Sequence, residues 1–221
     1  MKIVGFSRAL KLEWLNKTVE LLLEGKQEDE IKAELNEYLS FEIKSAIVLR
    51  KTREILLNVW VRQQPEIAEL KRMALGAWSD DGCNHLALHW CMILLAYPVF
   101  ADVSGLIGKI ADVQGAFTTT WIRSKLYDLW GERATLHYST AKILQTMRQL
   151  GILYPDKPGI YKINRYPVRK AEVLEIILLT IFRLEKKAWY DAPMLAAAPV
   201  MFPFTYEVSG EWLYRSEMLV T

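Results

Sequence analysis

Residues 139–163 read STAKILQTMRQLGILYPDKPGIYKI, a stretch that begins with a helical pattern and ends with a hairpin pattern. On a helix with 100° per residue, four apolar side chains share one face, namely Ile143, Leu144, Met147 and Leu150. The runs ILY and IYKI then flank the turn sequence PDKPG, which is typical of a β-hairpin. The sequence therefore predicts a helix over 139–150 and a hairpin over 152–163.

The other side of the predicted helix is basic and polar. It carries Lys142, Gln145 and Gln149, with Arg148 beside them. Ser139 is a suitable N-cap, and Gly151 is a suitable end. No acidic residue occurs between Glu132 and Asp156, so this face offers hydrogen-bond donors and no carboxylate.

The positive charge of the chain is concentrated around this stretch. The formal net charge is only +2, but residues 121–170 hold ten basic and three acidic side chains. Residues 1–50, 51–120 and 171–221 are each slightly negative. A basic block on a nearly neutral protein indicates a surface directed at an anionic partner.

A helix over 121–130 precedes this stretch, which gives the element order of a winged helix-turn-helix. In that arrangement the second helix, here 139–150, enters the major groove of DNA. The hairpin over 152–163 would be the wing, with Lys157 at its tip and Lys162 on a strand.

Residue type assigns the expected contacts with double-stranded DNA. Cationic side chains around the helices and the wing would neutralise phosphates, namely Arg123, Lys125, Arg133, Lys157, Lys162, Arg165, Arg169 and Lys170. Long donors on the probe helix could reach base edges, namely Lys142, Gln145, Arg148 and Gln149.

Two observations favour a plainer interpretation. The link GERATLHY, residues 131–138, is longer than the usual helix-turn-helix turn of about 3–4 residues. A helix with a Lys, Arg and Gln outer face is also common as a solvated surface of any folded protein.

The rest of the chain predicts a mostly α fold. Apolar spacing and breaker residues indicate further helices at about 8–24, 27–39, 44–63, 65–78, 82–97, 99–113, 119–130 and 168–188. The helix over 82–97 is apolar nearly all round and should be central. We expect a helical bundle over 1–114 and a basic winged-helix-like unit with a C-terminal helical extension over 115–221.

The C-terminal tail changes character. Three prolines within residues 192–204 predict an irregular, packed segment, a strand is expected over 204–208, and a short helix is expected from Ser209.

Composition limits the other possibilities. The longest apolar run, residues 173–184, contains Glu175 and Arg183 and is shorter than the roughly 20 residues of a membrane helix. No secretory signal pattern is recognisable, so we expect a cytoplasmic protein with reduced thiols and no membrane partner.

Catalytic and metal-binding motifs are weak. In CNHLALHWC, residues 83–91, the two histidines and the two cysteines fall on opposite sides of one helix, so the four cannot bind one ion. The carboxylates of residues 28–42 have the spacing of a solvated helix face. Nucleophile and nucleotide-binding motifs are not found. We therefore predict no metal, no cofactor and no enzymatic activity.

Several segments together resemble the small BrxA-type proteins of BREX phage-defence systems. They are FSRALKLEWLNKTVELLLEGKQEDEIKAEL, KSAIVLRKTREILLNVW, LALHWCMILLAY and STAKILQTMRQLGIL, in this order over residues 6–153. The resemblance implies a NusB-like helical protein that binds double-stranded DNA without catalysis, with other defence-system proteins as partners. Residues 165–221 extend beyond the likeness. A protein–protein adaptor and an RNA-binding factor are the alternatives.

Overall fold

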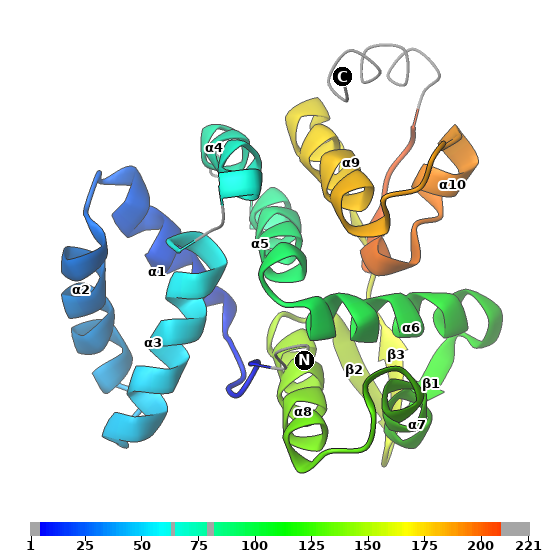
Figure 1. The fold of residues 1–221 in the computed structure, drawn as a ribbon, viewed down its shortest axis with the longest axis horizontal. Coiled ribbons are helices and arrows are strands. Elements are labelled where there is room, and N and C mark those ends of the chain that lie inside the picture. The colour runs from blue at the N-terminus through cyan, green and yellow to red at the C-terminus, as the bar shows by residue number, and fades with distance from the viewer. Residues whose placement is uncertain (1–4, 63–64, 79–81, 209–221) are drawn as a thin grey trace.

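The computed structural model describes residues 5–62, 65–78 and 82–208. These residues form ten α-helices and five short strands, so the predicted mostly α-helical fold is confirmed (Figure 1). The short helix expected from Ser209 lies outside the described residues.

Three helices make the N-terminal part of the molecule (Figure 1). They are α1 (Leu12–Leu23), α2 (Glu28–Ser40) and α3 (Ala46–Trp60). Each begins where a cap or charge pattern favours a start, as in α3, whose Ser45 side chain accepts from the Val48 N–H. After a 3-10 turn over Pro65–Ile67, α4 (Ala68–Gly76) follows.

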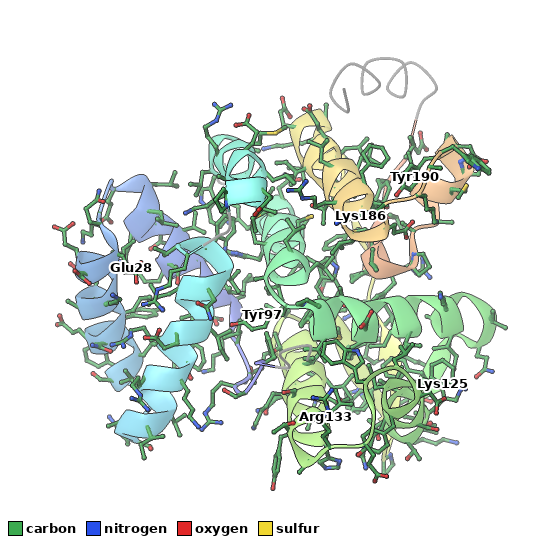
Figure 2. All side chains as sticks on the ribbon, viewed as in Figure 1. Glu28, Tyr97, Lys125, Arg133, Lys186 and Tyr190 are labelled. Atoms are coloured by element: carbon green, nitrogen blue, oxygen red, sulfur yellow. The ribbon has the colours of Figure 1, made fainter. Side chains whose placement is uncertain are left out.

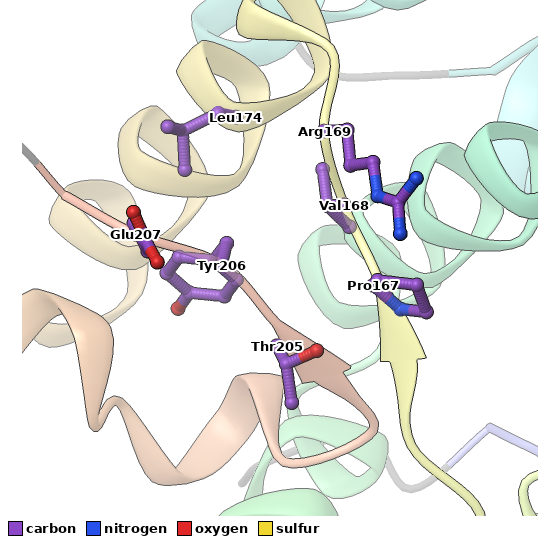
Figure 3. A pocket seen from close by; sticks show the side chains of 7 residues that line it. All are labelled: Pro167, Val168, Arg169, Leu174, Thr205, Tyr206 and Glu207. Carbon is purple, nitrogen blue, oxygen red and sulfur yellow. The ribbon is translucent and has the colours of Figure 1, made fainter.

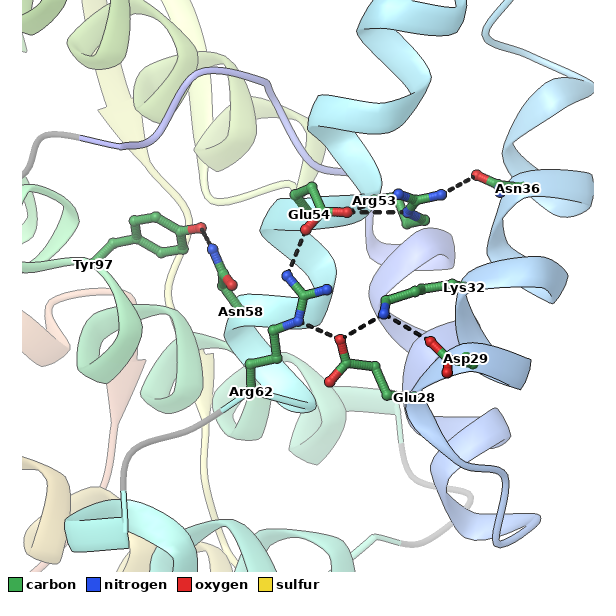
Figure 4. A network of polar contacts seen from close by, with 9 residues as sticks. All are labelled: Glu28, Asp29, Lys32, Asn36, Arg53, Glu54, Asn58, Arg62 and Tyr97. Carbon is green, nitrogen blue, oxygen red and sulfur yellow. Dashed lines mark hydrogen bonds and ion pairs between the residues drawn. The ribbon is translucent and has the colours of Figure 1, made fainter.

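Ion pairs join α2 to α3 (Figure 4). Arg62 donates to Glu28 of α2 and to Glu54 of α3, both at 2.5 Å. The arginine thus spans two helices. Glu28 belongs to the acidic run over residues 28–42, which lies largely on a solvated helix face as the sequence predicts. Glu28 and Glu54 thus link the helix pair through Arg62, although partly exposed ion pairs contribute little each.

The apolar helix α5 (Gly82–Ala96) is central, as predicted. It packs against α1, α3, α6 (Pro98–Gln114) and α9 (Ala171–Glu185). Its Trp90 is fully buried, and the indole N–H donates to the Val200 carbonyl at 2.9 Å. A helix that is apolar on all sides is stable only when other elements cover all of its sides, and these four helices cover α5.

The tail packs along α6, which fits the predicted irregular and packed segment. It contains α10 (Ala192–Ala196), a 3-10 turn over Pro199–Met201 and β5 (Phe204–Thr205). The turn lies so close to α6 that a Cβ at Gly108 would be 2.0 Å from the Pro199 carbonyl oxygen.

The hairpin predicted over 152–163 is confirmed, and it belongs to a three-stranded antiparallel sheet. The strands are β1 (Ala116–Thr118), β2 (Leu153–Lys157) and β3 (Ile160–Ile163), in the order β1-β3-β2. Two helices, α7 (Thr119–Trp130) and α8 (Ala134–Gln149), lie between β1 and β2 in the chain. A second, two-stranded sheet pairs β4 (Tyr166–Pro167) with β5 in parallel, so the strand expected over 204–208 is shorter than predicted.

The start of the predicted probe helix was wrong. The helix expected over 139–150 begins at Ala134, with Arg133 as its N-cap, and Ser139 is buried inside it. The cause is Leu136, which is fully buried and falls on the same apolar stripe as Ile143. Burial of that stripe outweighs the local capping signal of serine. The link after α7 therefore has three residues and not eight.

A single cluster of buried side chains extends from Phe6 and the N-terminal helices to the hairpin. Helix α6 packs against α7, α8 and β1. The division of the chain into units over 1–114 and 115–221 stays a prediction.

Within the described residues, no single helix has both the length and the apolar character needed to cross a membrane. The pair Asn84–Ala96 and Pro98–Ala111 satisfies both criteria only when its two halves, bent by 119°, are taken together.

Candidate nucleic-acid interface

A short turn fixes α8 against α7. Gly131 ends α7 with φ 76°, and its N–H donates to the Tyr127 carbonyl at 2.9 Å. The Arg133 guanidinium donates to the Trp130 carbonyl at 2.7 Å. The Trp130 indole donates in turn to the Asp102 carboxylate of α6, also at 2.7 Å. The turn is thereby anchored to α6, which limits rotation of α8 relative to α7.

The outer face of α8 is polar, and residues 134–149 contain no acid. Its exposed side chains include three of the four predicted base-reading residues, namely Gln145, Arg148 and Gln149. The fourth, Lys142, is half-buried and donates to the Gln145 amide oxygen at 3.1 Å. The apolar stripe with Ile143 and Met147 is fully buried, as predicted. The structure therefore brings these four residues to one face of α8.

The hairpin carries two of the predicted phosphate contacts. Lys157 is exposed beside its turn, and Lys162 of β3 forms an ion pair with Asp156 at 2.8 Å. This hydrogen bond raises the pKa of the Lys162 ammonium above its usual value. Because Asp156 offsets the charge of Lys162, Lys157 contributes the larger share of net positive charge at the tip.

The hairpin is joined to the start of α7. β1 pairs with β3 in register Phe117↔Tyr161, and the two rings stack with centroids 5.9 Å apart. The Thr119 N–H donates to the Gly159 carbonyl at 3.2 Å. At the same point, the Thr118 side chain accepts from the Trp121 N–H and caps α7. These contacts place the hairpin, α7 and α8 around a common hollow.

That hollow is a pocket of about 310 Å³, which we call the α7–α8–β3 pocket. Its lining is Thr119, Arg123, His137, Thr140, Ala141, Leu144, Gln145, Arg148 and Tyr161. The guanidinium of Arg148 lies 5.9 Å from the centre of the Tyr161 ring. With two arginines and no carboxylate among the described residues of its lining, the pocket is suited to binding an anion.

Other predicted contacts lie around this region but outside the pocket. Lys125 is on the exposed side of α7, where it pairs with Asp128 at 3.4 Å, and Arg133 is at the start of α8 (Figure 2). Arg133 uses part of its guanidinium for the turn, so it is held in place near the N-terminal end of α8.

Three predicted contacts follow the hairpin and are not gathered at the α7–α8–β3 pocket. Arg165 is exposed before β4, and Lys170 is the N-cap of α9. Arg169 lines a different pocket of about 480 Å³, between the start of α9 and the segment after β5 (Figure 3). The predicted site is therefore split between the α8 face with the hairpin and the entry to α9.

The sequence missed several residues of the pocket. His137 and Tyr138 precede the helix start that was predicted, so their place on α8 could not be assigned. Tyr138 lies outside the lining of the pocket and is 69% exposed. Thr119 and Tyr161 reach the pocket through the pairing of β1 with β3, which no local pattern indicates.

The histidines of α5 have structural partners. The Trp60 indole donates to His89 Nδ1 at 3.0 Å, and His89 Nε2 is 2.9 Å from the Asn16 amide oxygen. His85 stacks on Trp78 with ring centroids 3.7 Å apart. In the described part of the chain, no group of three or more His, Cys, Asp and Glu side chains is placed to bind a metal.

Comparison of the chain with models of protein families, with curated proteins and with solved structures gave no match in any of the three.

Proposed function

We propose that this protein binds double-stranded DNA without catalysing a reaction on it, using α8 as the probe helix and the β2–β3 hairpin as a wing. The observation that carries the proposal is the order α6, β1, α7, α8, β2, β3, combined with the sheet order β1-β3-β2 and the acid-free outer face of α8. This is the element order of a winged helix-turn-helix, in which the second helix of the pair enters the major groove.

The size of the turn supports the proposal. Three residues separate α7 from α8, which fits the helix-turn-helix geometry that the sequence alone made doubtful. The hydrogen bond from the Trp130 indole to the Asp102 carboxylate fixes the end of α7 to α6 and so stabilises this geometry. A rigid pair of helices can present one face to a groove at little cost in conformational entropy.

The chemistry of the face also supports it. Lys142 can donate a hydrogen bond to guanine, and Gln145 or Gln149 can pair with adenine. Lys157 is exposed on the hairpin and Lys125 is exposed on α7, and both suit phosphates. Phosphate contacts of this kind would give an affinity that falls steeply as salt concentration rises.

Fluorescence anisotropy with a labelled duplex over a salt series tests the proposal. We expect binding at low salt, with log K falling linearly against log salt concentration. An RNA duplex of the same sequence is the competitor, because its deep and narrow major groove excludes a helix. Anisotropy that stays flat up to tens of micromolar protein would end the proposal, and stronger competition by RNA would redirect it to RNA binding.

A protein-docking role is the second candidate, favoured by exposed apolar side chains at the α2–α3 corner. Phe41 is 74% exposed and Ile47 is 63% exposed. The 192–204 tail is a weaker candidate for a docking patch, because its Met201 and Phe202 side chains are buried. Under this candidate, Phe41→Ser with Ile47→Ser would abolish capture of a partner protein and leave duplex affinity unchanged.

We further propose an accessory role in a BREX-type phage-defence system, based on the resemblance over residues 6–153. A methyltransferase and a large ATPase encoded beside this protein would support that role. Full phage resistance of cells that lack only this protein, when the rest of such a system is present, would contradict it.

A further inference from the structure

The α7–α8–β3 pocket combines features of a site for a single phosphate group. Its two arginines come from different helices, Arg123 from α7 and Arg148 from α8, and both line the same hollow of about 310 Å³. Hydroxyl, amide and imidazole groups of Thr119, Gln145 and His137 line it as well. Among the described residues, the lining has no carboxylate that could neutralise the two guanidinium charges.

Arg123 provides a second, independent observation. Its Nε is buried and has no hydrogen-bond partner among the described residues. A buried N–H without an acceptor is destabilising, and most such groups in native proteins are satisfied by a protein group, a water or an ion. The side chain of Arg123 lines the pocket, so a small change in its rotamer would let an oxyanion bound there supply the missing acceptor.

The pocket is also built to hold its groups in place. Arg148 lies against the Tyr161 ring, and Tyr161 stacks on the buried Phe117. Thr119 is tied by its N–H to Gly159 in the hairpin. The guanidinium plane and the fork of N–H groups match the oxygens of a phosphate, and the nearby apolar side chain of Leu144 lowers local solvation.

We propose that Arg123 and Arg148 clamp one phosphate group in the α7–α8–β3 pocket. This inference rests on the proposed function for the source of the phosphate, which we take to be the backbone of the bound duplex. A free phosphomonoester has the same chemistry, so the test separates the two sources.

The test compares Arg123→Gln and Arg148→Gln with the control Arg50→Gln, which removes one exposed positive charge from α3. Each variant is titrated with inorganic phosphate, with 5′-dTMP and with a labelled duplex at constant ionic strength. We expect each pocket variant to weaken duplex binding about tenfold or more, because each removes a charge-assisted hydrogen bond. The control should change it less than threefold, by loss of general attraction alone.

Arg148 is exposed, so its variant keeps the test valid even if Arg123→Gln loses stability, which thermal unfolding would show. In the wild type, millimolar inorganic phosphate should displace the duplex more effectively than chloride of equal ionic strength. That preference should disappear in both pocket variants.

The outcomes separate the two proposals. In one outcome, the pocket variants lose phosphate and 5′-dTMP binding while their duplex affinity matches that of Arg50→Gln. That result would support a phosphate site but would show that its ligand is a free phosphate compound and not the duplex. Phosphate binding in a protein that binds no duplex would keep the site and reject DNA binding. Pocket variants that match Arg50→Gln with all three ligands would overturn the clamp.

Discussion

The backbone N–H of Thr119 donates to the carbonyl of Gly159 at 3.2 Å, and this bond joins the first turn of α7 to the turn of the hairpin. Gly159 has φ 77°, a conformation that L side chains rarely adopt. The helix pair and the hairpin are thus parts of one surface, and several consequences can be measured.

The N-cap of α7 should contribute to stability. Thr118→Ala removes the side-chain acceptor for the Trp121 N–H, so we expect the free energy of unfolding to fall by about 1 kcal/mol. The control is Thr120→Ala, also at an exposed position but inside the helix. Urea denaturation measures both, and equal effects of the two substitutions would show that the cap contributes nothing.

Close packing of the tail on α6 predicts a large effect at Gly108. In Gly108→Ala the new methyl group would meet the Pro199 backbone, so the turn must move, at a cost of about 1–3 kcal/mol. Gly76→Ala at the end of α4 is the matched control, because no described atom lies within 4 Å of the place its methyl group would take. That control should be neutral or slightly stabilising. Chemical denaturation that gives Gly108→Ala wild-type stability would contradict this packing.

Stability should fall on acidification because of His89. Burial lowers the pKa of this imidazole well below its usual value of 6.5, so the folded protein holds it neutral. Below about pH 6.5 the unfolded chain binds a proton at His89, whereas the folded protein does not. The contribution of neutral His89 to stability is therefore complete above that pH and is lost as the pH falls.

The expected slope from this histidine is at most about 1.4 kcal/mol per pH unit. Denaturation midpoints between pH 7.5 and pH 5 measure it, with His137→Gln as a control that removes a half-exposed histidine. A His89→Gln variant should lose stability and also lose part of the slope. An identical slope in that variant would rule out His89 as its origin.

Removal of Asp156 should strengthen DNA binding. Asp156→Asn leaves Lys162 without its ion-pair partner and removes a negative charge beside the tip of the hairpin, so duplex affinity should rise a few-fold at low salt. Asp29→Asn on α2 makes the same change in net charge at a side chain that is 94% exposed, and it should have a smaller effect. Competition binding at two salt concentrations distinguishes the two variants.

Local chemistry explains what the sequence could predict. Pro98 separates α5 from α6, Thr118 caps α7, and the Pro and Gly turn produces the hairpin, because each of these signals acts within a few residues. Ser139 failed as a cap because the buried side chain of Leu136 extends the helix through it. Residue type and helical period were sufficient to assign the outer face of α8.

The pocket could not be predicted, because its formation depends on contacts between distant segments. Tyr161 reaches Arg148 only after β3 pairs with β1 and the hairpin folds back on α8. The burial of the Arg123 Nε without a hydrogen-bond partner among the described residues also results from packing, and no sequence pattern predicts it. Spacing also grouped Arg169 with the other cations, whereas the fold places it at another pocket.

Charge reversal on α8 tests the proposed DNA binding most directly. Lys142→Glu with Arg148→Glu is compared with Arg50→Glu and Lys51→Glu on α3, which changes net charge equally at exposed positions. The measurement is duplex affinity by anisotropy over a salt series. We predict that the α8 variant loses at least tenfold in affinity and that its salt slope becomes shallower by about 1–2, while the α3 variant keeps the wild-type slope. Equal losses in both variants, or no duplex binding by the wild type at low salt, would contradict α8 as the DNA-binding face.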